Sequence, residues 1–292
     1  MLYPTILPNE LIRFKQVYNF YIQQTNKKAA QWAAFLFSLH LKIIFMSQTT
    51  IYGVHAIKEA FNAGRELIKI QVQKGLLNPQ VEEILSICRK QQVPVQFVPK
   101  EKFYSFKEKN HQGLVGYISP ISYHSIEQIV PQLFEEGKTP FIMVLDRLTD
   151  VRNLGAIART ALCAGVHAIV IPHTDSAPVN DDAVKTSAGA LMQLPVCREK
   201  NLKTVIEFLN QCGFTTLACT EKANNNLDQI ELSGPLAIIM GNEETGISND
   251  LIKKCTELGK IPMDFGLASL NVSVAAGIAM YEAMIQRKIA GS

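Results

Sequence analysis

The stretch Phe141–Pro172, "FIMVLDRLTDVRNLGAIARTALCAGVHAIVIP", carries the pattern that decides the fold. It begins with an apolar run that ends at Asp146, continues through a polar loop into a helical segment over 154–166, and closes with an apolar run over 168–172. Short, continuous apolar runs are typical of strands buried on both faces, which occur in parallel sheets covered by helices. The stretch therefore predicts a strand–helix–strand unit.

The same alternation continues toward the carboxyl end of the chain. We expect further strands over 194–198, 215–220, 235–241 and 259–263, separated by helices over 180–191, 201–213, 248–255 and 272–288. This order predicts an α/β domain with a mostly parallel sheet. Ligands of such sheets bind beyond the carboxyl ends of the strands, so the loops after Asp146, Met240 and Met263 are candidate sites.

A smaller α/β unit precedes this domain. Its expected elements are helices over 53–64 and 78–92, strands over 67–73, 93–98 and 113–119, and a basic helical turn over 100–110. The first 45 residues lack the alternation and end just before Met46, which favours a disordered extension or a start codon placed too far upstream. The expected division is an extension (1–45), the small unit (46–120), a linker with one short helix (121–139) and the larger domain (140–292).

The charges of the 292 residues are unevenly distributed, although the net charge is only +3. Residues 52–120 contain ten Lys or Arg against six Asp or Glu, whereas residues 140–292 contain thirteen against sixteen. A polyanionic partner is therefore expected to bind the small unit. The content of 47% hydrophobic and 19% charged residues is typical of a globular protein with a sizeable core.

The six cysteines are scattered, without a C-x-x-C pair or a histidine at ligand spacing, so we expect neither disulfides nor a metal site. No segment reaches the ~18–20 uncharged apolar residues that span a bilayer. The nearest approach, Ala29–Phe45, is interrupted by His40 and Lys42. We expect a cytoplasmic protein with reduced thiols and no membrane partner.

Three segments carry candidate chemistry. In the first, "NLGAIARTALCAG" (153–165), Gly155 permits a tight entry into the helix and Asn153 can cap it. Arg159 is the single charge among small residues there. It is either an ordinary surface arginine or a group that grips a phosphate or carboxylate, and the uncharged surroundings favour the second.

The second segment, "IIMGNEETGIS" (238–248), resembles a nucleotide-binding turn but lacks G-x-G-x-x-G and the G-K-[ST] of a phosphate loop. Glu243 and Glu244 would oppose an anion, so a neutral or cationic ligand suits the loop better. An ordinary turn with Ser248 as helix cap is an equal alternative on the spacing alone.

The third segment, "IPMDFGLASLNVSVAAGIAMYE" (261–282), places Ser269, Asn271 and Ser273 on alternate positions of an apolar stretch. One of them is expected to cap the following helix, but three polar residues exceed what a cap requires. The small residues 275–277 would let this helix approach another backbone or a flat ligand closely.

These three segments, in this order, resemble the motifs of the SpoU (TrmH-like) RNA ribose 2′-O-methyltransferases, and the resemblance extends over Met46–Ile289. "IYGVHAIKEAF" and "NHQGLVGYI" are similar to the N-terminal substrate-binding domain of the branch that methylates a guanosine of 23S rRNA. The sequence departs from many relatives at Val151–Arg152, where a Pro is common, and at "NEET", where small residues are common.

The resemblance implies a C-terminal domain with a trefoil knot, an N-terminal domain similar to the ribosomal L30e fold, a homodimer built from the C-terminal domain, and no metal. It implies bound S-adenosylmethionine, with cofactor contacts at Gly241, Ile261, Met263, Leu270 and Asn271. It implies catalytic roles for Asn153, Arg159, Glu243, Ser269 and Asn271.

The implied reaction is methyl transfer to the ribose 2′-oxygen of a guanosine in 23S rRNA, either free or in a ribosome assembly intermediate. A guanidinium with a pKa above ~12 is a poor base, so we expect Arg159 to clamp a phosphate, Glu243 to fix Asn153 and Arg159, and Asn271 to order the cofactor loop. The alternatives are a tRNA ribose 2′-O-methyltransferase, a non-catalytic RNA-binding protein and, less favoured, a nicotinamide enzyme.

Overall fold

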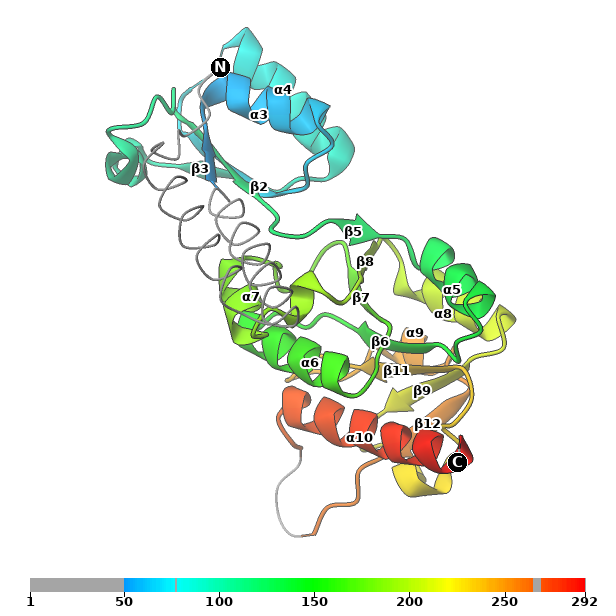
Figure 1. Ribbon diagram of the computed structural model, residues 1–292. Coiled ribbons are helices and arrows are strands. Elements are labelled where there is room, and N and C mark those ends of the chain that lie inside the picture. Colours follow the sequence, from blue (N-terminus) through cyan, green and yellow to red (C-terminus); the bar gives the residue numbers. More distant parts are fainter. Residues whose placement is uncertain (1–49, 77, 265–268, 292) are drawn as a thin grey trace, which may run out of the picture. The chain divides into compact units, whose positions relative to one another are not determined.

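The computed structural model describes residues 50–76, 78–264 and 269–291 (Figure 1). The contacts within the chain divide it at Thr49/Thr50, and both sheets described below lie in the unit that begins at Thr50. The expected extension 1–45 and the start at Met46 lie outside the described residues.

The larger sheet contains eight strands in the order β10-β12-β9-β11-β6-β7-β8-β5, and every described pair is parallel. The strands are β5 (Tyr123–His124), β6 (Phe141–Leu145), β7 (Ala168–Pro172), β8 (Val196–Glu199), β9 (Thr215–Cys219), β10 (Asn225–Asn226), β11 (Leu236–Met240) and β12 (Glu257–Lys260). The predicted α/β class with a parallel sheet is thus confirmed. The chain runs outward in one direction through β6, β7 and β8 and then returns to the other side for β9, so β6 and β11 flank the point where ligands of such sheets bind.

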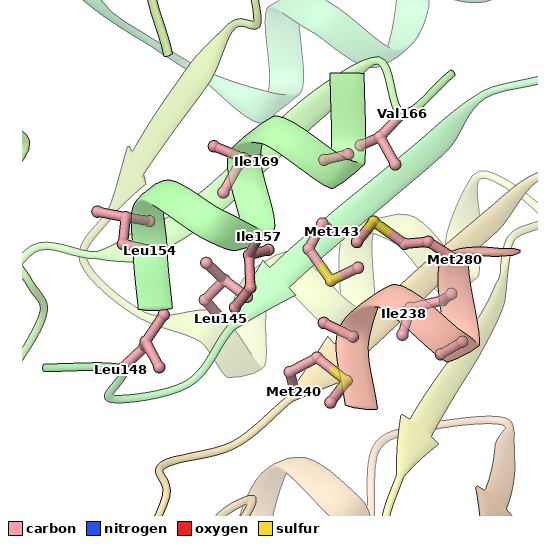
Figure 2. Close-up of a cluster of buried hydrophobic side chains, with 14 of the residues drawn as sticks. Met143, Leu145, Leu148, Leu154, Ile157, Val166, Ile169, Ile238, Met240 and Met280 are labelled. Atoms are coloured by element: carbon pink, nitrogen blue, oxygen red, sulfur yellow. The ribbon is translucent and has the colours of Figure 1, made fainter. Parts of the chain in front are cut away.

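Helices cover both faces of this sheet (Figure 1). One face carries α6 (Val151–Cys163), α7 (Asp181–Thr186), η2 (Ala190–Met192), η3 (Leu227–Gln229) and α10 (Val272–Ala290), and the other carries α5 (Ile126–Glu135), α8 (Leu202–Gln211) and α9 (Asn249–Ile252). Alternate residues of a strand enter opposite cores, as Met143 and Val144 of β6 do. Figure 2 shows Met143 and Ile238 beside Met280 of α10, within the first of these cores.

The smaller sheet has the order β1-β4-β2-β3, with β4 antiparallel to both its neighbours and β2 parallel to β3. Its elements are β1 (Thr50–Tyr52), α3 (Gly53–Asn62), β2 (Leu67–Gln73), α4 (Pro79–Gln91), β3 (Val95–Val98), η1 (Lys100–Phe106) and β4 (Leu114–Ile118). Ile57 of α3 and Ile84 of α4 pack onto Ile70 of β2 in a separate core. Asn78, where the sequence predicts this helix to begin, caps α4, because its side chain accepts the Val81 N–H at 2.9 Å.

Helix α6 begins three residues earlier than the sequence suggested. The predicted cap, Asn153, lies inside the helix, and Asp150 takes its place by accepting the N–H groups of Arg152 (2.6 Å) and Asn153 (3.0 Å). A carboxylate at this position also opposes the positive end of the helix dipole. The expectation that Asn153 caps the helix is therefore wrong, and its side chain is free for other contacts.

Other boundaries also differ from the predictions. The segment 121–139, expected to be a linker with one short helix, contains that helix, α5, which enters a core of the larger sheet, and also β5, which pairs with β8. The helix expected over 180–191 is interrupted where Ala188 (φ 50°) and Gly189 (φ 84°) adopt left-handed backbone angles. In the ranges that the structure describes, no helix has both the length and the apolar composition that crossing a bilayer requires.

Candidate active site

A cavity of about 450 Å³ opens at the carboxyl edge of the larger sheet. Its lining comes from three places: the end of β9 (219–222), the end of β11 with its loop (240–247), and the segment that leads into α10. The residues of that last part are Ile261, Met263, Ser269, Leu270, Val272 and Ala275. A cavity of this size, with mixed polar and apolar lining, suits a small organic ligand.

The loop after β11 is held in a narrow shape. A Cβ on Gly241 would lie 2.1 Å from the carbonyl carbon of Gly246, so only glycine fits there. Asn242 closes the loop because its side-chain oxygen accepts the N–H groups of Glu244 (2.9 Å) and Thr245 (3.1 Å). Backbone hydrogen bonds join Asn242 and Gly246 in both directions, at 3.2 and 2.9 Å.

Asp146 and Arg147 fasten the loop after β6 to the loop after β11. The Asp146 carboxylate is buried and accepts the Ser248 N–H at 2.8 Å and two bonds from the Arg147 guanidinium at 3.1 and 3.0 Å. Arg147 also donates to the Gly246 carbonyl at 3.0 Å, and Asn242 donates to the Arg147 carbonyl at 3.0 Å. The hydrogen bonds to Asp146 raise the pKa of Arg147. Neither residue was predicted to have a role; a carboxylate at the end of a buried strand was the available signal.

Three of the predicted catalytic residues meet at the edge of the loop after β11. The Asn153 side chain donates to Glu243 Oε1 at 2.8 Å and accepts from Asn271 Nδ2 at 3.2 Å. The Asn271 oxygen accepts both the backbone N–H (2.9 Å) and the hydroxyl (2.6 Å) of Ser273, which makes Asn271 the cap of α10. One residue from each of the three sequence motifs therefore joins a single hydrogen-bonded chain.

The other predicted site residues divide between the cavity and the surface. Gly241, Ile261, Met263 and Leu270 line the cavity, as do Ser269 and Glu243, whereas Asn271 does not. Arg159 is exposed on α6 and has no hydrogen bond or ion pair within the described ranges, so the expected contact between Arg159 and Glu243 is not present. Among the described residues, no cluster of His, Cys, Asp and Glu side chains could hold a metal ion.

Comparison with known proteins places this chain in a family. The family model described as "SpoU rRNA Methylase family" matches residues 140–281, and the model "RNA 2'-O ribose methyltransferase substrate binding" matches residues 50–124. A protein of Staphylococcus saprophyticus assigned to the TrmH family of tRNA/rRNA methyltransferases is 35% identical over 246 residues, 84% of this chain and 99% of the relative. One of Bacillus subtilis with the same assignment is 32% identical over 248 residues, 84% of this chain and 100% of the relative.

The chain belongs to the SpoU (TrmH) family of RNA methyltransferases. The SpoU methyltransferase AviRb of Streptomyces viridochromogenes, solved with S-adenosylmethionine, shares the fold with a TM-score of 0.53 at 21% identity, over 82% of this chain and 90% of that chain. An S-adenosylmethionine-bound rRNA methyltransferase of Sinorhizobium meliloti has a TM-score of 0.52 at 25% identity, over 80% and 86% of the two chains. The protein is accordingly an RNA methyltransferase that depends on S-adenosylmethionine.

The cavity of this SpoU family member has a lining that fits the cofactor. Glu221, Glu243 and Glu244 outnumber Lys222 on its wall, and such a surplus of negative charge favours the cationic sulfonium and ammonium groups of S-adenosylmethionine. Met240 and Val272 add apolar surface that suits an adenine ring.

The end of β9 also lines this cavity, which was not predicted from the sequence. Cys219, Thr220, Glu221 and Lys222 lie where β9 ends, at the same edge as the predicted loops. The rule that ligands bind beyond the carboxyl ends of strands could have identified them, had it been applied to the strand 215–220. Burial raises the pKa of the Cys219 thiol to about 11, which disfavours the reactive thiolate form near neutral pH.

Proposed function

We propose that the protein transfers a methyl group from S-adenosylmethionine to the ribose 2′-oxygen of a guanosine in 23S rRNA. The observation that carries this proposal is the hydrogen-bonded chain Glu243–Asn153–Asn271, which lies at the rim of the cavity and joins all three motifs. The choice of rRNA is supported by the similarity to the S. meliloti rRNA methyltransferase and by the matched substrate-binding domain. The guanosine follows from the resemblance of the sequence to that branch.

In this proposal the cavity holds the cofactor through Gly241, Ile261, Met263 and Leu270. Gly241 allows the backbone of the loop to close tightly, and the apolar side chains lie along the wall. Asn271 contributes by fixing the start of α10, directly after Leu270. Bound there, S-adenosylmethionine supplies an electrophilic methyl group.

The chain's own residues would orient the RNA and hold the nucleophile. Arg159 has no partner in the described structure, so its guanidinium is free to bind a phosphate next to the target ribose. Glu243 and Asn271 fix both ends of the Asn153 amide, which leaves that amide rigid at the rim. Orientation of the 2′-oxygen by such groups contributes much of the rate of a group transfer, and Ser269 lies on the same wall to position it.

We further propose the organisation that the family resemblance implies. The extension is 1–45, the L30e-like substrate-binding domain 46–120 and the knotted methyltransferase domain 140–292, and the connecting segment 121–139 contributes β5 and α5 to the larger sheet and its core. Retention of rRNA modification after removal of residues 1–45 would support the first boundary.

A homodimer is supported by an apolar stripe on α10. Val274, Ile278 and Tyr281 follow one another at helical spacing and are 50%, 40% and 60% exposed. Leu162 of α6, a helix that packs beside α10, is also exposed, and Arg159 precedes it by one helical turn. Burying this face against a second copy would remove the stripe from water and place Arg159 near the interface.

The test is methyl transfer by the purified protein to a 23S rRNA fragment and to tRNA, with radiolabelled S-adenosylmethionine. We expect label in the rRNA fragment, on a guanosine that survives digestion as an alkali-resistant dinucleotide. Label confined to tRNA would replace the proposal with the tRNA ribose activity. Label on a base rather than a ribose would contradict both.

A further inference from the structure

The turn η1, between β3 and β4, presents one aromatic ring to solvent while two others hold the turn in place. Phe103 is buried and stacks on His111 with ring centroids 5.0 Å apart, and Phe106 contacts Tyr52 at 5.4 Å. Tyr104, between them, is 52% exposed. A single exposed aromatic residue is common on protein surfaces, so its surroundings decide what it does.

Tyr104 lies in a stretch of exposed lysines, one of which contacts its ring. Lys107 Nζ lies 4.7 Å from the centroid of the Tyr104 ring, a distance typical of a cation–π contact. Lys100, Lys102, Lys107 and Lys109 are all exposed, and none forms an ion pair with a described residue. By contrast, Lys58 of α3 pairs with Glu83.

The turn also concentrates the positive charge of its domain. Residues 100–110 contain four lysines and two glutamates, a surplus of +2, and residues 50–124 contain ten basic and six acidic residues, a surplus of +4. Half of the surplus therefore lies on the turn and the four residues that follow it. Phosphates would be attracted to this turn more than to the two helices of the domain.

We infer that η1 is a stacking site for an unpaired base of the RNA substrate, with Tyr104 under the base and the lysines on the neighbouring phosphates. The inference rests on the proposed function only in taking RNA as the substrate. Lys107 covers one face of the ring, and the exposed remainder of the ring is available to a base. Stacking of bases on aromatic side chains combined with basic side chains along the backbone is how proteins hold single strands. Bases inside a duplex have no free face, so this site selects unpaired RNA.

The experiment measures binding of the full-length protein to a fluorescent 12-nucleotide oligoadenylate, and to the same strand in a duplex, at several salt concentrations. We expect Tyr104→Ala to weaken single-strand binding about tenfold, which corresponds to about 1.4 kcal/mol, and Tyr104→Trp to restore it. Lys107→Ala should make the fall of log K with log salt shallower by about 0.7 in slope, the value for one lost phosphate contact. Duplex binding should change less than twofold in Tyr104→Ala.

Two matched variants serve as controls. Phe97 of β3 is equally exposed, at 51%, but has no cation over its ring among the described contacts, and Lys90 of α4 is an exposed lysine away from the turn. Phe97→Ala and Lys90→Ala should leave single-strand binding and its salt slope within twofold of wild type.

Wild-type single-strand affinity in Tyr104→Ala would overturn the inference, and so would an equal loss in Phe97→Ala. Loss in the lysine variant alone would show that the turn attracts polyanions without stacking a base, as an acidic protein partner would require, and would also overturn it. Binding to the oligonucleotide needs no methyl transfer. Failure of the proposed reaction would therefore appear in the transfer assay while this binding assay stays unaffected.

Discussion

Asn271 donates its side-chain amide to the side-chain oxygen of Asn153, 118 residues earlier in the chain, over 3.2 Å. The bond joins the start of α10 to the first turn of α6, at the rim of the cavity that we assign to the cofactor. Asn153 also donates to Glu243, so the rim depends on three distant parts of the sequence being held together. Changes at this junction should affect function more than stability.

A comparison of Asn271→Ala with Asn201→Ala separates an effect on stability from an effect on cofactor binding. Both asparagines cap a helix, since Asn271 accepts the Ser273 N–H and Asn201 accepts the Lys203 N–H, each at 2.9 Å. Loss of either cap should lower the free energy of unfolding by about 1 kcal/mol. Only Asn271→Ala should also weaken S-adenosylmethionine binding, by tenfold or more, because Asn271 follows the cavity residue Leu270. Calorimetric titration and urea unfolding measure both, and unchanged cofactor affinity in Asn271→Ala would reduce this residue to a helix cap.

Asp150→Ala should lower stability with little effect on cofactor affinity, whereas Asn153→Ala should lower activity with little effect on stability. Asp150 caps α6, so its loss should destabilise the protein by about 1 kcal/mol while S-adenosylmethionine affinity stays within a few-fold of wild type. Asn153 is not the cap, and Asn153→Ala should leave the unfolding midpoint nearly unchanged while reducing single-turnover methyl transfer at least tenfold. A stable Asn153→Ala protein with full activity would remove Asn153 from the catalytic group.

Much of the fold could be predicted from the sequence because continuous apolar runs and cap residues are local signals. The strands over 141–145 and 168–172 and the cap at Asn78 are of this kind. Strand β5 was missed because it has two residues, and only its pairing with β8 makes it a strand. The start of α6 was misplaced because two possible caps, Asp150 and Asn153, lie three residues apart.

The site was predictable only where a motif could be matched. Gly241, Ile261, Met263 and Leu270, to which the motifs assign cofactor contacts, line one cavity, and their contact with the cofactor stays a prediction. The hydrogen bonds by which Asp146 and Arg147 hold the loop after β11, here called the brace, could not be predicted. Their partners, Gly246 and Ser248, are about 100 positions away, and the contacts arise only when β6 pairs with β11.

The brace leads to a prediction for Arg147. Arg147→Ala would leave the buried Asp146 carboxylate without its ion pair and the Gly246 carbonyl without its donor. We expect a loss of about 1–3 kcal/mol in stability and a weaker cofactor affinity, because the loop after β11 loosens. Arg147→Lys should recover only part of both, since an ammonium lacks the planar fork. Arg152→Ala, which removes an exposed arginine of the same region, should leave cofactor affinity unchanged; an equal effect there would contradict a specific role for the brace.

Stability should fall as the pH drops below about 6.5. Burial lowers the pKa of His167 from its ordinary value of 6.5, and the nearby Lys138 and Arg287 lower it further. The neutral ring accepts the Phe141 N–H through Nδ1 at 3.0 Å. Between the lowered pKa and 6.5 the unfolded chain binds more protons than the folded chain, so stability rises with pH in that window and is lost on acidification.

His167→Asn keeps an acceptor near the Phe141 N–H but removes the titration. Urea unfolding between pH 5 and 8 should therefore show a shallower acid loss in this variant, while His55→Asn, on the exposed surface of α3, should follow the wild-type curve. An acid loss in His167→Asn as steep as in the wild type would assign the effect to other groups.

The most direct measurement is a map of 2′-O-methyl groups in the rRNA and tRNA of a strain that lacks this protein, repeated after complementation with wild type and with Arg159→Ala. We expect one guanosine of 23S rRNA to lose its methyl group, wild type to restore it, and Arg159→Ala to fail although the variant binds S-adenosylmethionine within a few-fold of wild-type affinity. An unchanged 23S rRNA map, or restoration by Arg159→Ala, would contradict the proposed reaction and the role given to Arg159.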